Sequence, residues 1–563
     1  MPDILTHLTE ALKHPFQIRW TEHSFASILV CSGLYVMGIC LYQSEQGRTR
    51  DGAEHGSAAW ASPKQVNAMF AQKQNKILTR QVRLGLDTHK HRRSLNVLVI
   101  GGSGAAKTRS YVKPNILEAN TNYVITDPKS EVLLATGGWL ESQGYDIRVL
   151  NLVNLEQSDG YNPFRYLRDE KDALKLVNNL IQATTPKGSH ESDPFWTKAE
   201  TALLQAIILM LFQEAPEYEQ NFSMVMRVLE YAEVKEEDEE YVSPLDLLFQ
   251  AIERENPNSV AVHQYKVFKM AAGKTAKSIL ISCGARLAPF DIPQLREIMS
   301  YDELELDKLG DEKSALFFLI SDTDTTYNFL VALAFSQMFN LLCERADNTY
   351  GGRLPYHVRV LWDEAANTGQ VPGLEKIVAV IRSREISLTL FYQAMSQCKA
   401  LYKDHSETIM GNMDSIVFLG GREASTLKDI SENWLGKATI SMQTEGRSRG
   451  QSESYSQNMQ RLGRELMTTS EITTMPGDKC ILQLRGLPPF LSPKYDLKKH
   501  PNYKYTAEFD KKKNAFRLES LFRHRPLRLK PEDEYTVYEV DGSDTDEEAD
   551  LLNFDDLDSD EFV

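Results

Sequence analysis

A glycine-rich loop follows the apolar run at residues 97–100 and ends in Lys-Thr. Its residues are Gly101, Gly102, Ser103, Gly104, Ala105, Ala106, Lys107 and Thr108. In such a loop, successive backbone N–H groups converge on phosphate oxygens, the lysine adds a positive charge, and the threonine hydroxyl completes a Mg²⁺ shell. The loop therefore predicts a phosphate-binding site of the kind that holds a nucleotide.

Ala106 departs from the strict phosphate-loop pattern, which is Gly, four residues, and then Gly-Lys-Ser/Thr. An alanine methyl at this position can crowd the loop or restrict its backbone dihedrals, which leaves the rate of hydrolysis open. The alternative interpretation of the segment is a glycine-rich turn between a strand and a helix, with an accidental Lys-Thr. A second motif has to decide between the two.

Asp363 and Glu364 supply that second motif, because they directly follow the apolar run at 358–362. Beside a phosphate loop, one acid can hold Mg²⁺ through water and the next can polarise the attacking water. Alone, an Asp-Glu pair more often marks the N-terminus of a helix. Together with Lys107 and Thr108 it favours a nucleotide hydrolase, with Asp363 and Thr108 at the metal.

Three further polar residues lie near this motif. Gln393 closes the next apolar run, where it can sense the γ-phosphate or orient water; the alternative is a glutamine that faces solvent. Arg382 and Arg384 lie between the two runs. Either arginine can reach the nucleotide of a neighbouring subunit as an arginine finger, or form a surface salt bridge.

These motifs need a sheet that brings them to one edge. Short apolar runs that alternate with helical spacers occur at 97–100, 123–126, 147–152, 315–320, 358–362, 387–392 and 415–419. This alternation predicts a parallel sheet covered by helices, in an α/β fold. Between about 165 and 310, helical segments such as 196–212 predict an all-helical insertion that splits the sheet-forming sequence in two.

A chain of 563 residues is too long for one core and should form several domains. We divide it into an N-terminal segment (1–23), a transmembrane helix (24–43), a juxtamembrane linker (44–90), the two parts of a nucleotide-binding domain (91–165 and 311–497) separated by an all-α domain (166–310), a basic segment (498–530) and an acidic disordered tail (531–563).

The membrane helix rests on residues 25–42, which contain no charged side chain and approach the length that crosses a bilayer. Trp20 and Tyr42 suit the membrane interface, and Arg48 and Arg50 suit a cytoplasmic end. The alternative is a buried helix of a soluble protein. We expect a protein of the cell membrane with the bulk of the chain in the cytoplasm.

The net charge of −16 is concentrated in residues 531–563, which hold fifteen acidic residues and no lysine or arginine. The rest of the chain is nearly neutral, unlike a free DNA-binding protein, which is usually basic overall. The basic segment predicts binding to nucleic acid or anionic lipid, or it neutralises the acidic tail. The tail itself is either a docking segment for a DNA-processing partner or a solubility tail.

The segment LWDEAANTGQVPGLEKIVAVIRSREISLTLFYQAMSQ resembles the TraG/TraD family of type IV secretion coupling proteins. The same resemblance extends to the phosphate loop and to TDPKSE (126–131), SDTDTTYN (321–328) and GLPPFLSPKYD (486–496), and it covers about residues 20–505. It implies a membrane-anchored, RecA-like P-loop ATPase that brings relaxase-bound single-stranded DNA to a type IV secretion channel during conjugation.

By resemblance, ATP and Mg²⁺ are the cofactors and the active assembly is a homohexamer around the DNA. The roles that carry over are phosphate and metal binding for Lys107 and Thr108, the second acidic motif for Asp363 and Glu364, the trans-acting arginine for Arg382 and the sensor for Gln393. The alternative function, motivated by Ala106, is a nucleotide-binding substrate receptor with little ATP turnover.

Overall fold

The computed structural model describes residues 12–13, 20, 22–46, 53–185, 194–234, 241–271, 273–448 and 454–519. The chain divides into two compact units, Met1–Arg517 and Leu518–Val563. The predicted acidic tail lies outside the described residues, and so does most of the predicted N-terminal segment.

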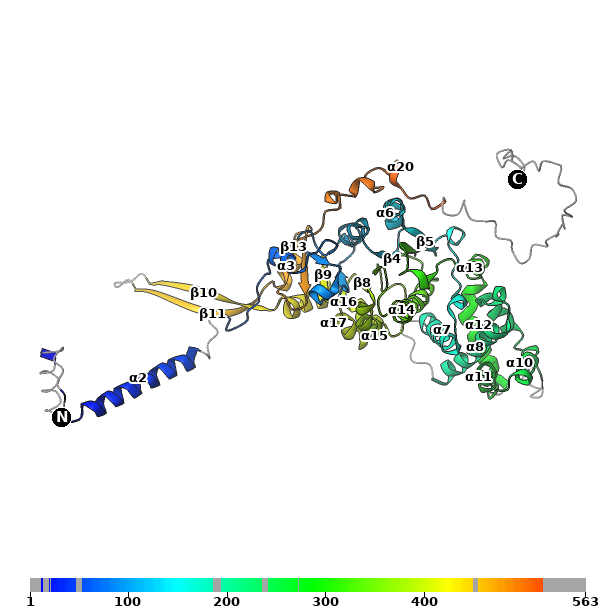
Figure 1. Cartoon of the computed structure of the whole chain (residues 1–563), viewed down its shortest axis with the longest axis horizontal. Coiled ribbons are helices and arrows are strands. Elements are labelled where there is room, and N and C mark those ends of the chain that lie inside the picture. The colour runs from blue at the N-terminus through cyan, green and yellow to red at the C-terminus, as the bar shows by residue number, and fades with distance from the viewer. Residues whose placement is uncertain are drawn as a thin grey trace. The chain divides into compact units, whose positions relative to one another are not determined.

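A nine-stranded sheet forms the core of the first unit among the described residues (Figure 1). Its strands are β3 (Val97–Ile100), β4 (Asn122–Asp127), β5 (Asp146–Asn151), β6 (Ser314–Leu319), β7 (Val358–Trp362), β8 (Ile386–Tyr392), β9 (Ser415–Phe418), β12 (Lys479–Leu484) and β13 (Phe490–Pro493). They follow the order β13-β12-β9-β3-β8-β7-β4-β6-β5. The strands from β9 to β5 are parallel, whereas β12 runs antiparallel to both of its neighbours.

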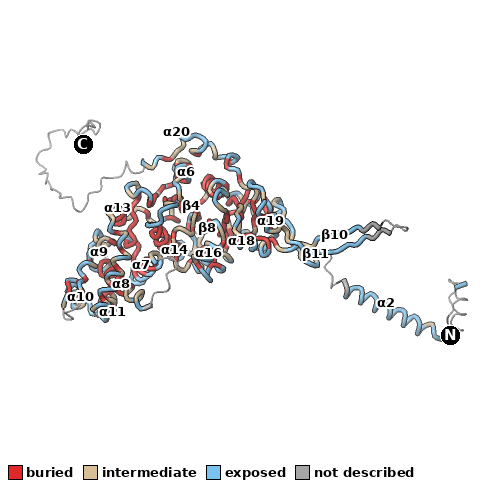
Figure 2. The backbone as a smooth tube through the Cα atoms, turned by 180° about the vertical axis from the view of Figure 1, so that it is seen from behind, coloured by how far each residue is buried: buried red, intermediate tan, exposed pale blue. Residues whose placement is uncertain are grey.

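The central strands are apolar runs because both faces of the sheet are covered. Every residue of β3, β4, β6, β7 and β8 is buried, as expected for parallel strands that lie between two layers of helices. Figure 2 shows the buried residues concentrated around β4 and β8, with exposed residues toward the outside. The predicted α/β fold class is confirmed.

Several helices among the described residues flank the sheet. They are α5 (Lys113–Leu117), α6 (Glu131–Ser142), α14 (Phe329–Thr349), α15 (Leu374–Val380), α16 (Met395–Tyr402), α17 (His405–Gly411) and α18 (Ala424–Asp429). Helix α14 buries most of its length, and Phe335 on it packs edge-on against Trp362 of β7, with ring centroids 4.6 Å apart.

The predicted all-helical insertion is present between β5 and β6. It contains α7 (Glu170–Thr184), α8 (Pro194–Glu214), α9 (Phe222–Glu230), α10 (Pro244–Glu255), α11 (Val260–Lys269), α12 (Gly273–Leu287) and α13 (Pro293–Ile298). Helix α8 lies at its centre and contacts α7, α9, α11 and α12. Helices α8 and α14 are long and apolar enough to cross a membrane, but most of each is buried inside the protein.

Helix α2 (Ser24–Gln46) covers the predicted transmembrane segment. Its span Ser24–Ser44 has a mean hydropathy of 2.0 and is not buried by the rest of the protein. The helix is therefore long and apolar enough to cross a bilayer, and its exposed apolar surface is what a membrane-spanning helix presents to lipid.

Residues 53–91, within and just after the predicted linker, contain α3 (Pro63–Phe70), β1 (Asn75–Ile77), β2 (Arg83–Gly85) and α4 (Thr88–His91). Residues 54–58 are joined to the base of a two-stranded ribbon, β10 (Lys437–Ser448) and β11 (Ser454–Glu465), which extends away from the sheet (Figure 1). Ala58 N donates to Lys437 O at 3.0 Å, and Thr439 N donates to Gly56 O at 3.1 Å. We call this contact the seam.

The segment after β13, residues 494–517, packs along α5 and α6, and we call it the C-terminal strap. Tyr505 stacks on Trp139 with ring centroids 4.7 Å apart. The Phe516 ring is buried directly against Gly137, where a Cβ would come within 2.7 Å of it.

The remaining elements are α19 (Thr469–Thr473), α20 (Lys511–Asn514) and short 3₁₀ or π turns at η1 (Thr108–Val112), η2 (Leu155–Gln157), η3 (Pro163–Tyr166), η4 (Glu217–Glu219), η5 (Ala288–Asp291), η6 (Leu306–Lys308), η7 (Ile381–Arg384), η8 (Ile430–Leu435), η9 (Leu497–Lys499) and η10 (Tyr503–Tyr505).

Candidate active site

The carboxyl ends of β3, β8, β7 and β4 meet at one edge of the sheet, because these neighbouring strands are parallel and in register there. A cavity of about 410 Å³ opens at this edge. Its lining consists of residues 102–109 of the phosphate loop together with Asp127, Pro128, Lys129, Glu131, Asp322, Asp363, Glu364, Asn367 and Gln393. The fold therefore brings together the phosphate loop, the acidic pair and the glutamine that the sequence predicts.

The phosphate loop is tightly packed at one glycine and has a left-handed backbone at two other positions. Gly101 is buried, and a Cβ there would lie 3.0 Å from the Ala105 Cβ. Gly104 has φ +76°, and Ala106 has φ +65°. A left-handed backbone costs a residue with a Cβ roughly 1–2 kcal/mol. Ala106 is thus accommodated in the loop, but in a strained backbone conformation.

Lys107 lies at the bottom of the cavity, where its ammonium has two oxygen neighbours. Its Nζ donates to Gly101 O at 3.1 Å and lies 3.4 Å from Glu364 Oε1. Gln393 Nε2 reaches the same carboxylate, at 3.3 Å from Glu364 Oε2. Glu364 is therefore held between the phosphate-loop lysine and the glutamine at the end of β8.

Asp363 and Thr108, the two residues predicted to hold the metal, are also in contact. Thr108 Oγ1 donates to Asp363 Oδ2 at 3.4 Å, and Glu364 N donates to Asp363 Oδ1 at 3.0 Å. Burial raises the pKa of Asp363 to about 6, while the neighbouring Lys107 acts to lower it. The carboxyl thus titrates close to neutral pH.

Asp127, at the end of β4, is a site residue that the motif analysis did not single out. Its Oδ2 accepts hydrogen bonds from Val132 N and Leu133 N, at 2.8 and 2.9 Å. Its Oδ1 is buried and has no hydrogen-bond partner among the described residues. Burial raises the pKa of Asp127 to about 6.

The oxygen atoms of Thr108, Asp363 and Asp127 fit a magnesium ion. Mg²⁺ prefers oxygen ligands, keeps several waters and is bound through one or two carboxylates together with substrate phosphates. The buried Oδ1 of Asp127 without a partner is a free acceptor for a metal-bound water. The signal for Asp127 in the sequence is its place directly after an apolar run, which is the same signal that identifies Asp363.

Arg382 lies elsewhere. It belongs to η7, which precedes β8, so it lies at the amino end of the strand whose carboxyl end carries Gln393. It lines a separate cavity of about 400 Å³ together with His89. Arg384 forms the predicted alternative, an ion pair with Asp347 at 2.7 Å. Within one chain, Arg382 does not reach the candidate active site, and its role in trans stays a prediction.

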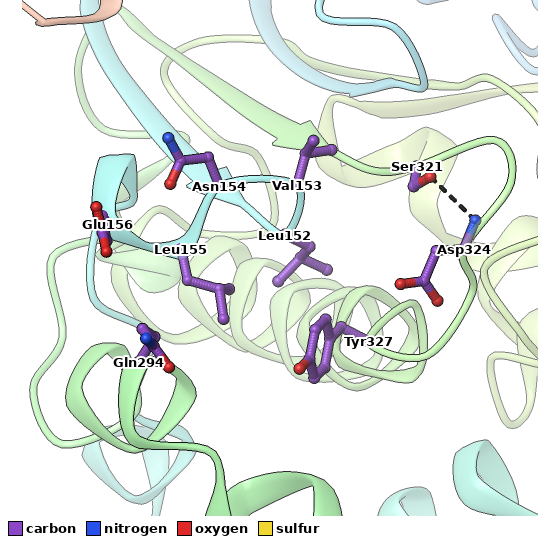
Figure 3. Close-up of a pocket in the computed structure, with 9 residues that line it drawn as sticks. All are labelled: Leu152, Val153, Asn154, Leu155, Glu156, Gln294, Ser321, Asp324 and Tyr327. Atoms are coloured by element: carbon purple, nitrogen blue, oxygen red, sulfur yellow. Dashed lines mark hydrogen bonds between the residues drawn. The ribbon is translucent and has the colours of Figure 1, made fainter.

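A further cavity of about 430 Å³ lies beyond the loop that follows β6 (Figure 3). Its lining residues come from the loop after β5, from α13 and from the loop before α14: Leu152, Val153, Asn154, Leu155, Glu156, Gln294, Ser321, Asp324 and Tyr327. Asp324 N donates to Ser321 Oγ at 3.0 Å. Asp322 of the same loop lines the candidate active site, so this loop separates the two cavities.

The chain is similar to several curated conjugal transfer proteins named TraG. It is 22% identical to the protein of Rhizobium radiobacter over 402 residues, which cover 70% of this chain and 60% of the relative. It is also 22% identical to the protein of Agrobacterium fabrum, with 70% and 58% covered, and to that of Escherichia coli over 460 residues, with 76% and 71% covered. The chain thus spans about 60% of the length of the first two relatives.

Among solved structures, the bacterial conjugative coupling protein TrwBdeltaN70 has the same fold. It matches with a TM-score of 0.56 at 16% identity, over 80% of this chain and 97% of that chain. The plasmid coupling protein TrwB in complex with ADP and Mg²⁺ matches with a TM-score of 0.56 at 15% identity, over 78% and 94%.

A family model described as Type IV secretory system Conjugative DNA transfer matches residues 53–514. The matched range begins after α2 and contains the whole sheet, the all-α insertion, the candidate active site and most of the C-terminal strap. The resemblance found in the sequence motifs is confirmed, and the chain belongs to the type IV secretory system family of conjugative DNA transfer proteins.

Proposed function

We propose that this chain is a membrane-anchored coupling ATPase that recruits relaxase-bound single-stranded DNA and drives it to a type IV secretion channel. The observation that carries the proposal is the cavity in which Lys107, Thr108, Asp363, Glu364 and Gln393 meet. Membership of the conjugative DNA transfer family supports the DNA substrate. A solved relative with the same fold binds ADP and Mg²⁺, which supports ATP and Mg²⁺ as the cofactors here.

The geometry supports an order of events in hydrolysis. Lys107 pairs with Glu364 at 3.4 Å. A γ-phosphate attracts the Lys107 ammonium and so leaves the Glu364 carboxylate able to take a proton from the attacking water. Gln393, in contact with Glu364, orients that water. Thr108 and Asp363 would hold Mg²⁺, which would supply positive charge for the phosphates.

Arg382 completes the site from a neighbouring subunit in this proposal. It lies at the opposite edge of the sheet from the phosphate loop of its own chain. A homohexamer, with DNA in the central channel, would present it to the next nucleotide. Helix α2 would anchor each subunit in the cell membrane, with the bulk of the chain in the cytoplasm and in contact with channel proteins.

Phosphate release by the full-length protein in detergent, with and without single-stranded DNA, tests the proposal. The wild type should hydrolyse ATP and respond to DNA, whereas Lys107→Ala and Glu364→Gln should fall to background. Lys171→Ala, a substitution of an exposed lysine of α7 that does not line the cavity, serves as the control. Background rates in the wild type would contradict the ATPase.

A nucleotide-binding receptor with little turnover is the second candidate function, and the strained backbone of Ala106 favours it. This candidate predicts that the wild type binds ADP with Mg²⁺ but releases phosphate no faster than Lys107→Ala. Equilibrium ADP binding, measured on the same protein sample, therefore separates the two functions.

A further inference from the structure

The C-terminal strap contacts the phosphate loop directly, through Lys494. Its Nζ donates to Ala105 O at 3.0 Å, across 389 residues of sequence. The backbone of Lys494 is fixed as well, because it directly follows β13 and its N donates to Asp478 O at 2.7 Å. Lys494 is half-buried and is not among the residues that line the cavity.

The acceptor of this hydrogen bond belongs to the peptide that joins Ala105 to Ala106. Rotation of that peptide plane changes φ of Ala106, which is +65°. If the plane turned over, the Ala105 carbonyl would point away from Lys494 and Ala106 would relax to the negative φ that an alanine prefers. The ammonium of Lys494 therefore opposes relaxation of the strained residue.

Other contacts of the strap hold the helical segment that follows the loop. Glu508 pairs with Lys113 at 2.8 Å and with Arg109 at 3.4 Å. Asn502 Nδ2 donates to Leu117 O at 2.9 Å. The strap thus contacts the loop, the turn η1 and the helix α5. These contacts hold the backbone of the strap, and with it Lys494, in place beside the loop.

We propose that Lys494 is a positioning residue for nucleotide binding, which keeps the Ala105–Ala106 peptide in its phosphate-binding orientation because residue 106 is alanine. The inference rests on the proposed nucleotide site. According to this inference, Lys494 compensates for the absence of a glycine at position 106. With glycine at position 106, the left-handed conformation carries no such cost and the lysine is dispensable.

A simple electrostatic effect of Lys494 on the phosphates is the competing explanation. The two explanations differ in a background with Ala106→Gly. A lysine that holds the peptide matters only while residue 106 is strained, whereas a lysine that attracts phosphate through its charge matters equally with alanine or glycine at position 106.

The test is equilibrium binding of a fluorescent ADP analogue with Mg²⁺ to the full-length protein in detergent. Lys494→Met keeps the stem and removes the charge-assisted hydrogen bond, and it should weaken binding about tenfold. Lys494→Arg should retain most of the affinity. In the Ala106→Gly background, Lys494→Met should weaken binding less than about threefold. Lys512→Met, in the exposed part of the strap, is the matched control and should have no effect.

Equal losses in the two backgrounds would overturn the inference, and so would wild-type affinity of Lys494→Met. Recovery of binding in the double variant supports it and also shows that the single variant is folded, because a glycine in the loop would not rescue an unfolded protein. If the wild-type protein binds no nucleotide, the proposed function fails. If the wild type binds nucleotide but the affinities of the Lys494 variants differ from those expected, only the inference about Lys494 fails.

Discussion

Acidification should weaken the Mg²⁺-dependent part of nucleotide binding through Asp363. Its carboxyl has to be ionised to contact the cation, because a proton and the metal compete for the same carboxylate oxygens. Burial raises the pKa of Asp363 to about 6. At such a value, roughly nine-tenths of the carboxyl is ionised at pH 7 and roughly one-tenth at pH 5. The advantage that Mg²⁺ gives to ADP binding should therefore fall about tenfold over this range.

The assay is titration of the full-length protein with ADP at pH 5, 6, 7 and 8, in Mg²⁺ and in EDTA. The ratio of the two dissociation constants isolates the metal-dependent part. Asp363→Asn is the control, because it has nearly the same shape and does not titrate. The ionisation of the nucleotide itself is the same for both proteins. A ratio that stays flat in the wild type, or the same slope in Asp363→Asn, would refute the reasoning.

The same pKa shift fixes the sign of a stability effect. Burial disfavours the ionised form of Asp363 in the folded protein. Between pH 3.8, the ordinary pKa of the carboxyl, and about pH 6, the folded chain therefore binds more protons than the unfolded chain. Its stability consequently falls as the pH rises through this window, and the cost is fully present above pH 6. Thermal unfolding of wild type and Asp363→Asn across pH 4–7 measures the difference.

Three further predictions concern the loop, the strap and the subunit contact. Ala106→Gly should stabilise the loop by about 0.5–1 kcal/mol, because the relief of left-handed strain exceeds the extra conformational entropy that glycine gives the unfolded chain. Amide hydrogen exchange at residues 101–108 measures this effect. Gly137→Ala places a Cβ within 2.7 Å of Phe516, so it should displace the strap and speed its proteolysis. Arg382→Ala should abolish DNA-stimulated phosphate release and leave ADP binding intact.

Two of these predictions have a matched control. Gly411→Ala places alanine at a glycine of α17 that has nothing within 4 Å of its Cβ position and no positive φ, so proteolysis of the strap should not change. Arg384→Ala removes an arginine that already pairs with Asp347, and it should leave phosphate release near the wild-type rate. Loss of ADP binding in Arg382→Ala would place that residue in the site of its own chain, against the topology.

The sequence predicts the parallel strands well because their burial leaves a plain signal. A strand such as β8 is apolar along its whole length, since both of its faces are covered. The same pattern does not predict the ribbon of β10 and β11, because its described side chains are mostly exposed and its sequence contains no apolar run. Strands β12 and β13 lie at the side of the sheet, and partly exposed residues interrupt their apolar pattern.

The candidate site is predicted in part for the same reason. Lys107, Asp363 and Gln393 each follow an apolar run, so strand ends alone suggest that they meet. Asp127 has the same position, but its importance depends on β4 lying next to β7, and strand order is not written in a single sequence. The role of Lys494 is harder to predict than that of Asp127, because its contact with the loop joins segments that are far apart in the sequence.

The seam between residues 54–58 and the ribbon limits how far the sheet domain can lie from α2. Six residues separate Gln46, the last residue of α2, from Ala53, and such a stretch spans about 25 Å at most. Gly56 allows the close approach, since a Cβ there would overlap Lys437 O. A force pulling on α2 would thus reach the base of the ribbon through a short stretch of chain, and in the proposed function the seam would be the point at which the sheet domain is held to its anchor.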